Sequence, residues 1–225
     1  MFFDKIFIYL WRRKALNSFV SNEFEKSLKY FKKIYKKNPN EKGIRYNLGL
    51  VSLAMKNFKK AKKYFKENYL RNQNYINTKA LGDLYYLWGK QEKAINYYQK
   101  SLKKCKDKRD ENFINNRIEI CKDNKKFEKS LKSQNFVDKG MDYLNNEKYD
   151  KAMDKFKKAA EMDKTNFVAY NNIATIFMNQ KNNYEKALEY FEKANSLIYN
   201  PVVKQNINKL NKVISNIEKE EDNSE

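Results

Sequence analysis

The stretch GMDYLNNEKYDKAMDKFKKA, residues 140–159, decides the fold of this chain. Its small and aromatic residues stand at steps of three, nine, four and three, at Gly140, Tyr143, Ala152, Phe156 and Ala159. The same steps recur in residues 82–101 and, with the last small residue lost, in residues 49–68. These two copies start 33 residues apart, close to the ~34 residues of one helix–turn–helix unit in a helical solenoid. The repeat therefore predicts an all-α solenoid.

The spacing resembles that of the tetratricopeptide repeat (TPR) family, in which small residues let two helices approach and aromatic residues fill the space between successive pairs. The resemblance implies a right-handed α-solenoid with a C-terminal capping helix, here expected over residues 202–219. The acidic tail 220–225 is expected to be disordered. We assign five helix–turn–helix units, the first of them a degenerate copy: 8–41, 42–74, 75–108, 133–166 and 167–201.

Residues 109–132 interrupt the period, because Ala94 and Ala152 are 58 residues apart, less than two full units. The apolar residues predict one amphipathic helix and a second short one, through Ile114, Ile118 and Cys121 and through Phe127 and Leu131. Two interpretations remain open. Either a basic module of residues 1–108 ends here with capping or junction helices, or the segment is a degenerate repeat inside one continuous superhelix.

The composition argues against an enzyme or a metalloprotein. The chain has no histidine and only two cysteines, Cys105 and Cys121, whereas a structural zinc site normally takes four Cys or His ligands. No glycine-rich phosphate loop is present either. We therefore expect a non-catalytic protein without metal or cofactor, with two free thiols in a reducing cytoplasm.

The first fourteen residues, MFFDKIFIYLWRRK, allow two interpretations. Their apolar run is far shorter than the ~18 residues that a membrane span needs, and the pattern is not that of an export signal. The segment is expected to be a capping helix that runs into the first repeat. The alternative is an interfacial membrane helix with Phe2, Phe3, Ile6, Phe7 and Leu10 inserted and with Arg12, Arg13 and Lys14 on lipid headgroups.

Charge is distributed unevenly along the chain. Residues 1–132 contain 34 Lys and Arg against 13 Asp and Glu, whereas residues 133–225 contain 14 against 15. Such asymmetry indicates an anionic partner, although a lysine-rich solvated surface that reflects codon bias explains it equally well. The candidate contacts to an anionic surface lie on the helix-B segments: Lys26, Lys29, Lys33, Lys60, Lys63, Lys93 and Lys100.

Helix A of each unit lines the concave face in this family, and the resemblance therefore implies a second candidate surface. Its residues are mostly apolar and aromatic, as in a groove that holds a peptide with hydrophobic anchors. The predicted groove consists of Arg12, Leu16, Phe19, Tyr46, Asn47, Leu50, Leu53, Lys79, Asp83, Tyr86 and Leu87.

The family's two-carboxylate clamp for chaperone C-terminal tails is not expected here. Arg12 and Asn47 match its pattern, but Leu16, Ile76 and Ala80 stand where the pattern requires polar or basic residues.

The sequence therefore predicts a cytoplasmic interaction adaptor that binds another protein in its groove. The alternative is electrostatic docking of the basic repeats to an anionic membrane surface, which would make the protein peripheral to the membrane, or to nucleic acid without sequence specificity. Only six of the 48 basic residues are arginine, which weakens a specific nucleic-acid role.

Overall fold

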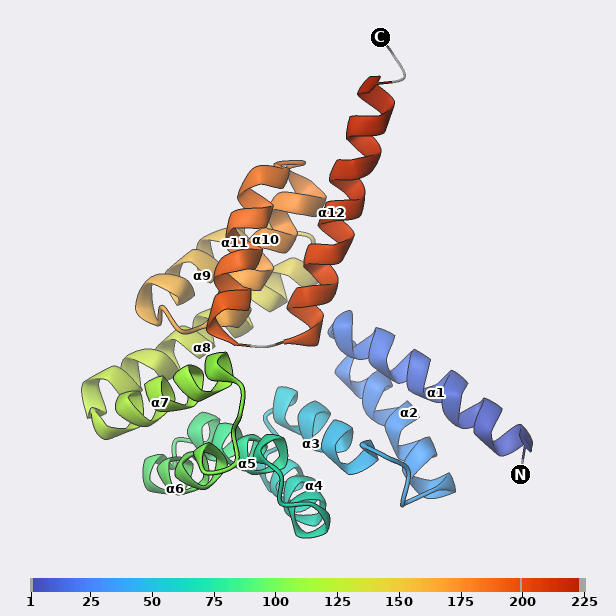
Figure 1. Ribbon diagram of the computed structural model, residues 1–225, viewed down its shortest axis with the longest axis vertical. Coiled ribbons are helices and arrows are strands. Elements are labelled where there is room, and N and C mark those ends of the chain that lie inside the picture. Colours follow the sequence, from blue (N-terminus) through green and yellow to red (C-terminus); the bar gives the residue numbers. More distant parts are fainter. Residues whose placement is uncertain (1, 199, 223–225) are drawn as a thin grey trace. The chain divides into compact units, whose positions relative to one another are not determined.

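The computed structural model describes residues 2–198 and 200–222, and these residues form α-helices joined by short turns, without a β-strand (Figure 1). The prediction of an all-α fold is confirmed. The chain divides into two compact units, Met1–Lys104 (unit 1) and Cys105–Glu225 (unit 2), each of which is described by itself.

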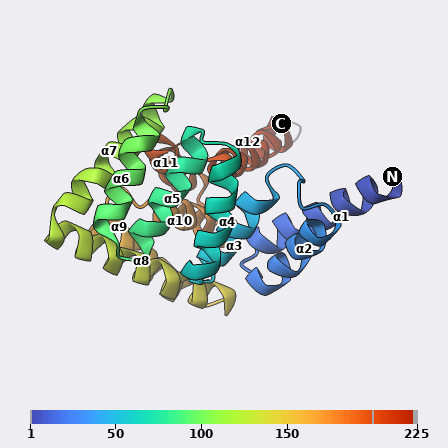
Figure 2. The ribbon, with the colours of Figure 1, turned by 90° about the horizontal axis from the view of Figure 1, so that it is seen from below.

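Unit 1 contains three helix pairs, each of which packs on the next (Figure 2). Its helices are α1 (Phe2–Val20), α2 (Phe24–Lys37), α3 (Ile44–Ala54), α4 (Phe58–Arg71), α5 (Tyr75–Leu87) and α6 (Gln91–Leu102). The first helix of each pair is helix A of a repeat and the second is helix B.

Unit 2 contains two further pairs flanked by a helix at either end. Its helices are α7 (Lys108–Lys122), α8 (Asn124–Asn145), α9 (Tyr149–Met162), α10 (Phe167–Gln180), α11 (Tyr184–Leu197) and α12 (Pro201–Asp222). Helix α12 packs on α11 and α10 and so closes the C-terminal end of this unit. Helix α7 packs on α8 and α11.

In three of the five pairs, a glycine of helix A and an aromatic residue sixteen positions later in helix B are in close contact. A Cβ atom built on Gly49 would lie 2.5 Å from the ring of Phe65, and one built on Gly82 would lie 2.5 Å from the ring of Tyr98. Such distances are too short for a real Cβ contact, so the ring of helix B occupies the space that a side chain on helix A would need. This contact explains why the motif keeps its spacing.

The turns within the five pairs share one backbone feature, a single residue with positive φ. Only one of these residues is a glycine, the residue that adopts this conformation without strain. The five residues are Asn22, Lys56, Gly89, Glu147 and Asn182. The turn between α1 and α2, the pair with the degenerate sequence, therefore has the same backbone conformation as the turns of the other four pairs.

Two details differ from the sequence predictions. Phe127 and Leu131 do not form a separate short helix, because α8 is continuous for 22 residues from Asn124. The break before α8 is the single residue Asp123, whose side chain accepts a hydrogen bond from the Lys126 amide and caps the helix. Helix α12 extends to Asp222 and includes residues that we expected to be disordered, whereas residues 223–225 of the predicted tail lie outside the described residues.

Candidate functional site

The helix-A surface of unit 1 is the first candidate site. On α3, Tyr46, Leu50 and Leu53 stand one helical turn apart and are half-buried, and they pack against the cluster around Phe65 and Leu81. These side chains keep one edge in solvent while the other edge supports the core. This arrangement suits anchors that are held in place before a partner arrives.

A polar group lies on α5 of the same surface. The Lys79 ammonium donates to the Asp83 carboxylate over 2.8 Å, and the Tyr98 hydroxyl donates to the other Asp83 oxygen over 2.8 Å. The Lys79 side chain is only 14% exposed. Because α6 supplies the tyrosine, Asp83 is fixed by both helices of its repeat. The sequence prediction did not include Ile76, which is 45% exposed on the next turn of α5.

The remaining predicted groove residues have varied environments. Leu16 is 44% exposed, and Arg12 forms an ion pair with Glu41. The ring of Phe19 contacts that of Phe24. Asn47 and Leu87 are half-buried on α3 and α5.

Tyr86 is a correction to the predicted groove. It is 4% exposed and its ring packs edge-on against Tyr98, with the centroids 6.4 Å apart. The side chain belongs to the core of the third repeat and offers no surface to a partner. Tyr85 is also buried, at 5% exposed, so two adjacent positions of α5 point inward where the sequence suggested one.

The seven lysines predicted on the helix-B segments are all exposed. The ammonium groups of several of them lie over aromatic rings, in cation–π contact. The Lys33 ammonium lies 5.7 Å from the ring centre of Trp11 and 5.6 Å from that of Tyr30. Lys93 and Lys100 lie in the same way over Tyr85 and Tyr97.

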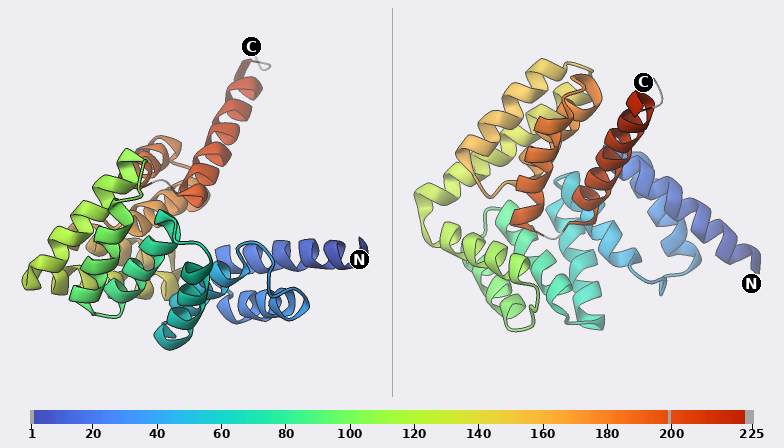
Figure 3. Two further views of the ribbon diagram at one scale, coloured as in Figure 1. Left: turned by 60° about the horizontal axis from the view of Figure 1, so that its bottom comes forward. Right: turned by 45° about the horizontal axis from the view of Figure 1, so that its top comes forward.

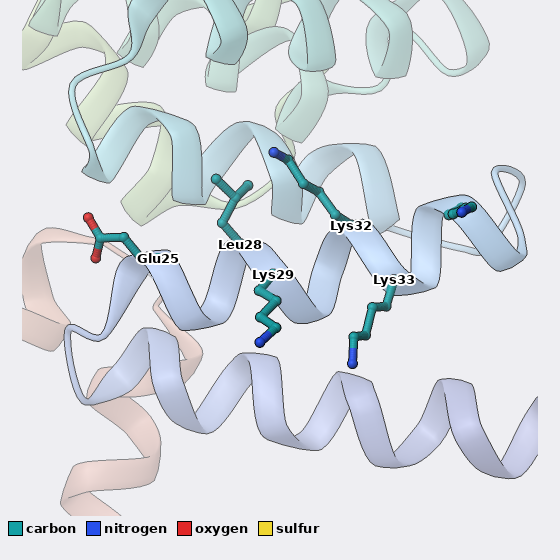
Figure 4. A pocket seen from close by; sticks show the side chains of 6 residues that line it. Glu25, Leu28, Lys29, Lys32 and Lys33 are labelled. Atoms are coloured by element: carbon teal, nitrogen blue, oxygen red, sulfur yellow. The ribbon is translucent and has the colours of Figure 1, made fainter.

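A shallow depression runs along α2, and cations line most of it. Figure 4 shows Lys29 and Lys33 directed to the side of α1 and Lys32 directed to the opposite side. Its lining residues are Glu25, Leu28, Lys29, Lys32, Lys33 and Lys36. The sequence prediction missed Lys32 and Lys36, although their spacing of three and seven residues from Lys29 was a signal that could have placed them beside it.

Comparison with known families identifies the repeats. Models described as tetratricopeptide repeat match residues 137–196, 43–74 and 80–103. The chain belongs to the tetratricopeptide repeat family. The matched segments cover the second and third pairs of unit 1 and both pairs of unit 2, together just over half of the chain.

Several solved structures resemble this TPR protein at a distance. A crystal structure of MamA protein is 16% identical, with 85% of this chain and 91% of that chain covered and a TM-score of 0.40. YrrB, described as a TPR protein with an unusual peptide-binding site, is 20% identical over 88% and 90% of the two chains, with a TM-score of 0.42. The TPR2AB domain of yeast Sti1, in complex with a pHSP90 component, is 16% identical over 90% and 96%, with a TM-score of 0.45. No curated protein sequence matches the chain.

The TPR units also contain a buried polar network that the sequence did not reveal. In unit 2, the Arg117 guanidinium on α7 lies 3.1 Å from the Asp163 carboxylate, and the two side chains are 11% and 4% exposed. Ser130 on α8 and Thr165 donate to the same carboxylate. Burial alone would raise the pKa of Asp163, but the charge of Arg117 and these hydrogen bonds outweigh burial and lower it. Because Asp163 is the C-cap residue of α9, the network joins α7 to α8 and to the end of α9.

The environments of the two thiols make them unreactive. Burial raises the pKa of the Cys121 thiol to about 12, and it also raises the pKa of the Cys105 thiol. Both cysteines are therefore poor nucleophiles at neutral pH. Within residues 2–198 and 200–222, no three His, Cys, Asp or Glu side chains come together as metal ligands would. In the same part of the chain, no helix combines the length and the apolar character that crossing a membrane requires.

Proposed function

We propose that this TPR protein is a non-catalytic adaptor that binds a segment of a partner protein on the helix-A surface of unit 1. The membership in a family of interaction repeats supports the general role. The observation that carries the specific proposal is the row Tyr46, Leu50 and Leu53 on α3, with Ile76 exposed on the adjacent helix A.

The chemistry of this surface defines the kind of segment that fits. Half-buried apolar and aromatic side chains favour a partner with aliphatic or aromatic anchors, because burying each such side chain removes apolar area from water. The Lys79–Asp83 pair adds one cation and one anion beside the anchors. It therefore favours a partner segment with a polar or charged residue between its apolar ones.

The test is affinity capture with the full chain, followed by direct binding of peptides from each captured protein. Leu50→Lys combined with Ile76→Lys places two charges among the anchors and should reduce partner binding by tenfold or more. Both positions retain contact with solvent, so circular dichroism should show an unchanged helical content.

A matched control introduces the same two changes away from this surface. Leu70→Lys combined with Val202→Lys replaces side chains that are 75% and 39% exposed on α4 and α12. The control should capture the same partners as the wild type. If the Leu50→Lys, Ile76→Lys variant captured the same partners as the wild type and bound their peptides with the same affinities, the proposal would be wrong.

A further inference from the structure

Helix α1 is apolar on two opposite faces. One face carries Ile8, Trp11 and Ala15, which pack in the core of the first helix pair, where Ala15 is fully buried. By helical periodicity, Ile6, Leu10 and Val20 lie on the side opposite to Ala15. An apolar helix face is normally covered by another element, but in unit 1 α1 packs chiefly on α2, at the edge of the unit (Figure 3).

The exposed apolar side chains of the described residues gather on this one helix. Nine large apolar side chains are exposed, and six of them belong to α1. We call the side that faces away from the core the α1 outer face, and it consists of Ile6, Tyr9, Leu10 and Val20. The exposed ring of Phe7 lies at its margin, in contact with the ring of Trp11. Tyr9 and Val20 are 64% and 58% exposed. Exposed large apolar side chains gathered on one helix in this way indicate an interaction surface.

Cations border the α1 outer face. By helical periodicity Arg13 lies on the outer face itself, next to Ile6, and Lys14 lies at its side. Lys29 and Lys33 point from α2 towards the near side of α1 (Figure 4), where the Lys33 ammonium lies over the ring of Trp11. Residues 2–37 contain ten Lys and Arg against three Asp and Glu. Two of these acids already form ion pairs, Asp4 with Lys37 at 2.7 Å and Glu23 with Lys26 at 2.6 Å. The first helix pair is therefore strongly positive.

We propose that the α1 outer face docks on the surface of a bilayer that contains anionic lipids. The aliphatic and aromatic side chains lie at the boundary between headgroups and acyl chains, and Arg13, Lys14, Lys29 and Lys33 contact the lipid phosphates. An exposed apolar face bordered by lysine and arginine is the pattern of a helix that lies in the membrane interface. Cations near an anionic leaflet add to the affinity of such a helix.

Charge argues against the other occupants of this face. A second copy of the chain would bring two strongly positive surfaces together, which is repulsive at low salt. A nucleic acid would contact the lysines through its phosphates, but these contacts would not involve the exposed isoleucine, leucine and valine side chains. The bilayer surface is the occupant that uses both properties of the face. This proposal does not depend on the helix-A surface of the proposed function.

The test is co-sedimentation of the full chain with vesicles of phosphatidylcholine, with and without phosphatidylglycerol. We expect binding only to the anionic vesicles, weakening as the Debye length falls from ~30 Å at 0.01 M salt to ~8 Å at 0.15 M. Ile6→Gln, Tyr9→Gln and Leu10→Gln together should weaken binding about a hundredfold, because they remove the inserted apolar area. These side chains are exposed, so the fold should be retained.

Two matched controls distinguish binding through the α1 outer face from binding that depends only on the total apolar content or net charge of the chain. Leu70→Gln, Ile76→Gln and Val202→Gln remove three exposed apolar side chains elsewhere and should leave vesicle binding unchanged. Arg13→Gln, Lys29→Gln and Lys33→Gln should weaken binding about a hundredfold, at about fivefold for each cation near an anionic surface. Lys60→Gln, Lys63→Gln and Lys66→Gln on α4 change the net charge equally and should weaken it clearly less.

Three results would each overturn the proposal. The first is the absence of binding to anionic vesicles at low salt. The second is vesicle binding at the wild-type level by the variant of Ile6, Tyr9 and Leu10, or an equal loss of vesicle binding in the two variants that remove cations. Either result would mean that the net positive charge of the chain, and not a docking face, attracts it to the vesicles. The third is binding to single-stranded RNA that displaces the vesicles and is insensitive to the apolar variant. The Leu50→Lys, Ile76→Lys variant should bind vesicles normally, which separates this proposal from that of the adaptor role.

Discussion

Helices α1 and α7 each begin a compact unit, yet their surfaces differ. In α7, Phe113, Ile114 and Ile118 are all buried, whereas Asn112 and Asn115 on its other side are exposed. Helix α1 buries one apolar face and exposes another. A helix that only has to close the end of a unit needs one apolar face, and α7 has just that. The second apolar face of α1 is therefore not explained by the fold of unit 1.

The two helices are also attached differently. Helix α7 is fixed by the buried pair of Arg117 and Asp163, and its ring of Phe113 packs edge-on against Phe167 of α10. Helix α1 is held by apolar packing and by partly exposed ion pairs, those of Arg12 with Glu41 and of Asp4 with Lys37. The contacts that hold α1 are therefore on one of its sides, whereas Ile6, Tyr9, Leu10 and Val20 on the outer face are exposed.

The largest expected effect comes from breaking the buried pair of α7. Arg117→Met leaves the Asp163 carboxylate, which is 4% exposed, without its countercharge. Removing one partner of a buried pair costs about 3–5 kcal/mol. Urea unfolding should show this loss, whereas Arg13→Met, an exposed change on α1, should cost less than about 0.5 kcal/mol. Equal effects of the two changes would contradict the contrast between the helices.

A second prediction compares two isoleucines. Ile114→Ala on α7 removes a fully buried side chain and should destabilise the protein by about 2–5 kcal/mol. Ile6→Ala on α1 shortens a side chain that is 41% exposed and should cost less than about 0.5 kcal/mol. Thermal unfolding of both variants measures the difference. A large loss for Ile6→Ala would show that its face is structural.

The smallest predicted effect concerns the pH dependence of the stability of unit 2 at acid pH. The pKa of Asp163 is lower in the folded protein than in the unfolded chain. Its stabilising contribution is therefore complete above the unfolded pKa of ~3.9 and is lost as pH falls through the folded pKa. In Asp163→Asn this part of the acid dependence should disappear, as chemical denaturation at several pH values can show. An unchanged pH profile would mean that Arg117 does not hold this carboxylate.

The sequence predicted the repeats because their defining contacts are local. The close approach of Gly49 to Phe65, or of Gly82 to Tyr98, joins two residues of one helix pair, so a fixed spacing records it directly. The Arg117–Asp163 pair joins residues 46 apart that belong to no repeat motif, and no spacing announces it. Only the structure could reveal how α7 is attached.

The candidate surfaces were predicted less completely. The sequence placed Leu50 and Leu53 on the helix-A side of α3, and both are half-buried there. It also placed Tyr86 in the groove, where the ring is buried, because a one-residue uncertainty in helix register turns a side chain by more than a quarter of a turn. For the first fourteen residues the sequence left a capping helix and an interfacial membrane helix open, and only the packing on α2 shows which side chains of α1 are covered.

The most direct test of the contrast between α1 and α7 is hydrogen–deuterium exchange of the full chain with and without vesicles that contain phosphatidylglycerol. We expect the vesicles to slow the exchange of backbone amides in α1 and to leave that of the amides in α7 unchanged. Equal slowing along α4 and α6, or no change in α1 under conditions where the chain binds the vesicles, would contradict this expectation.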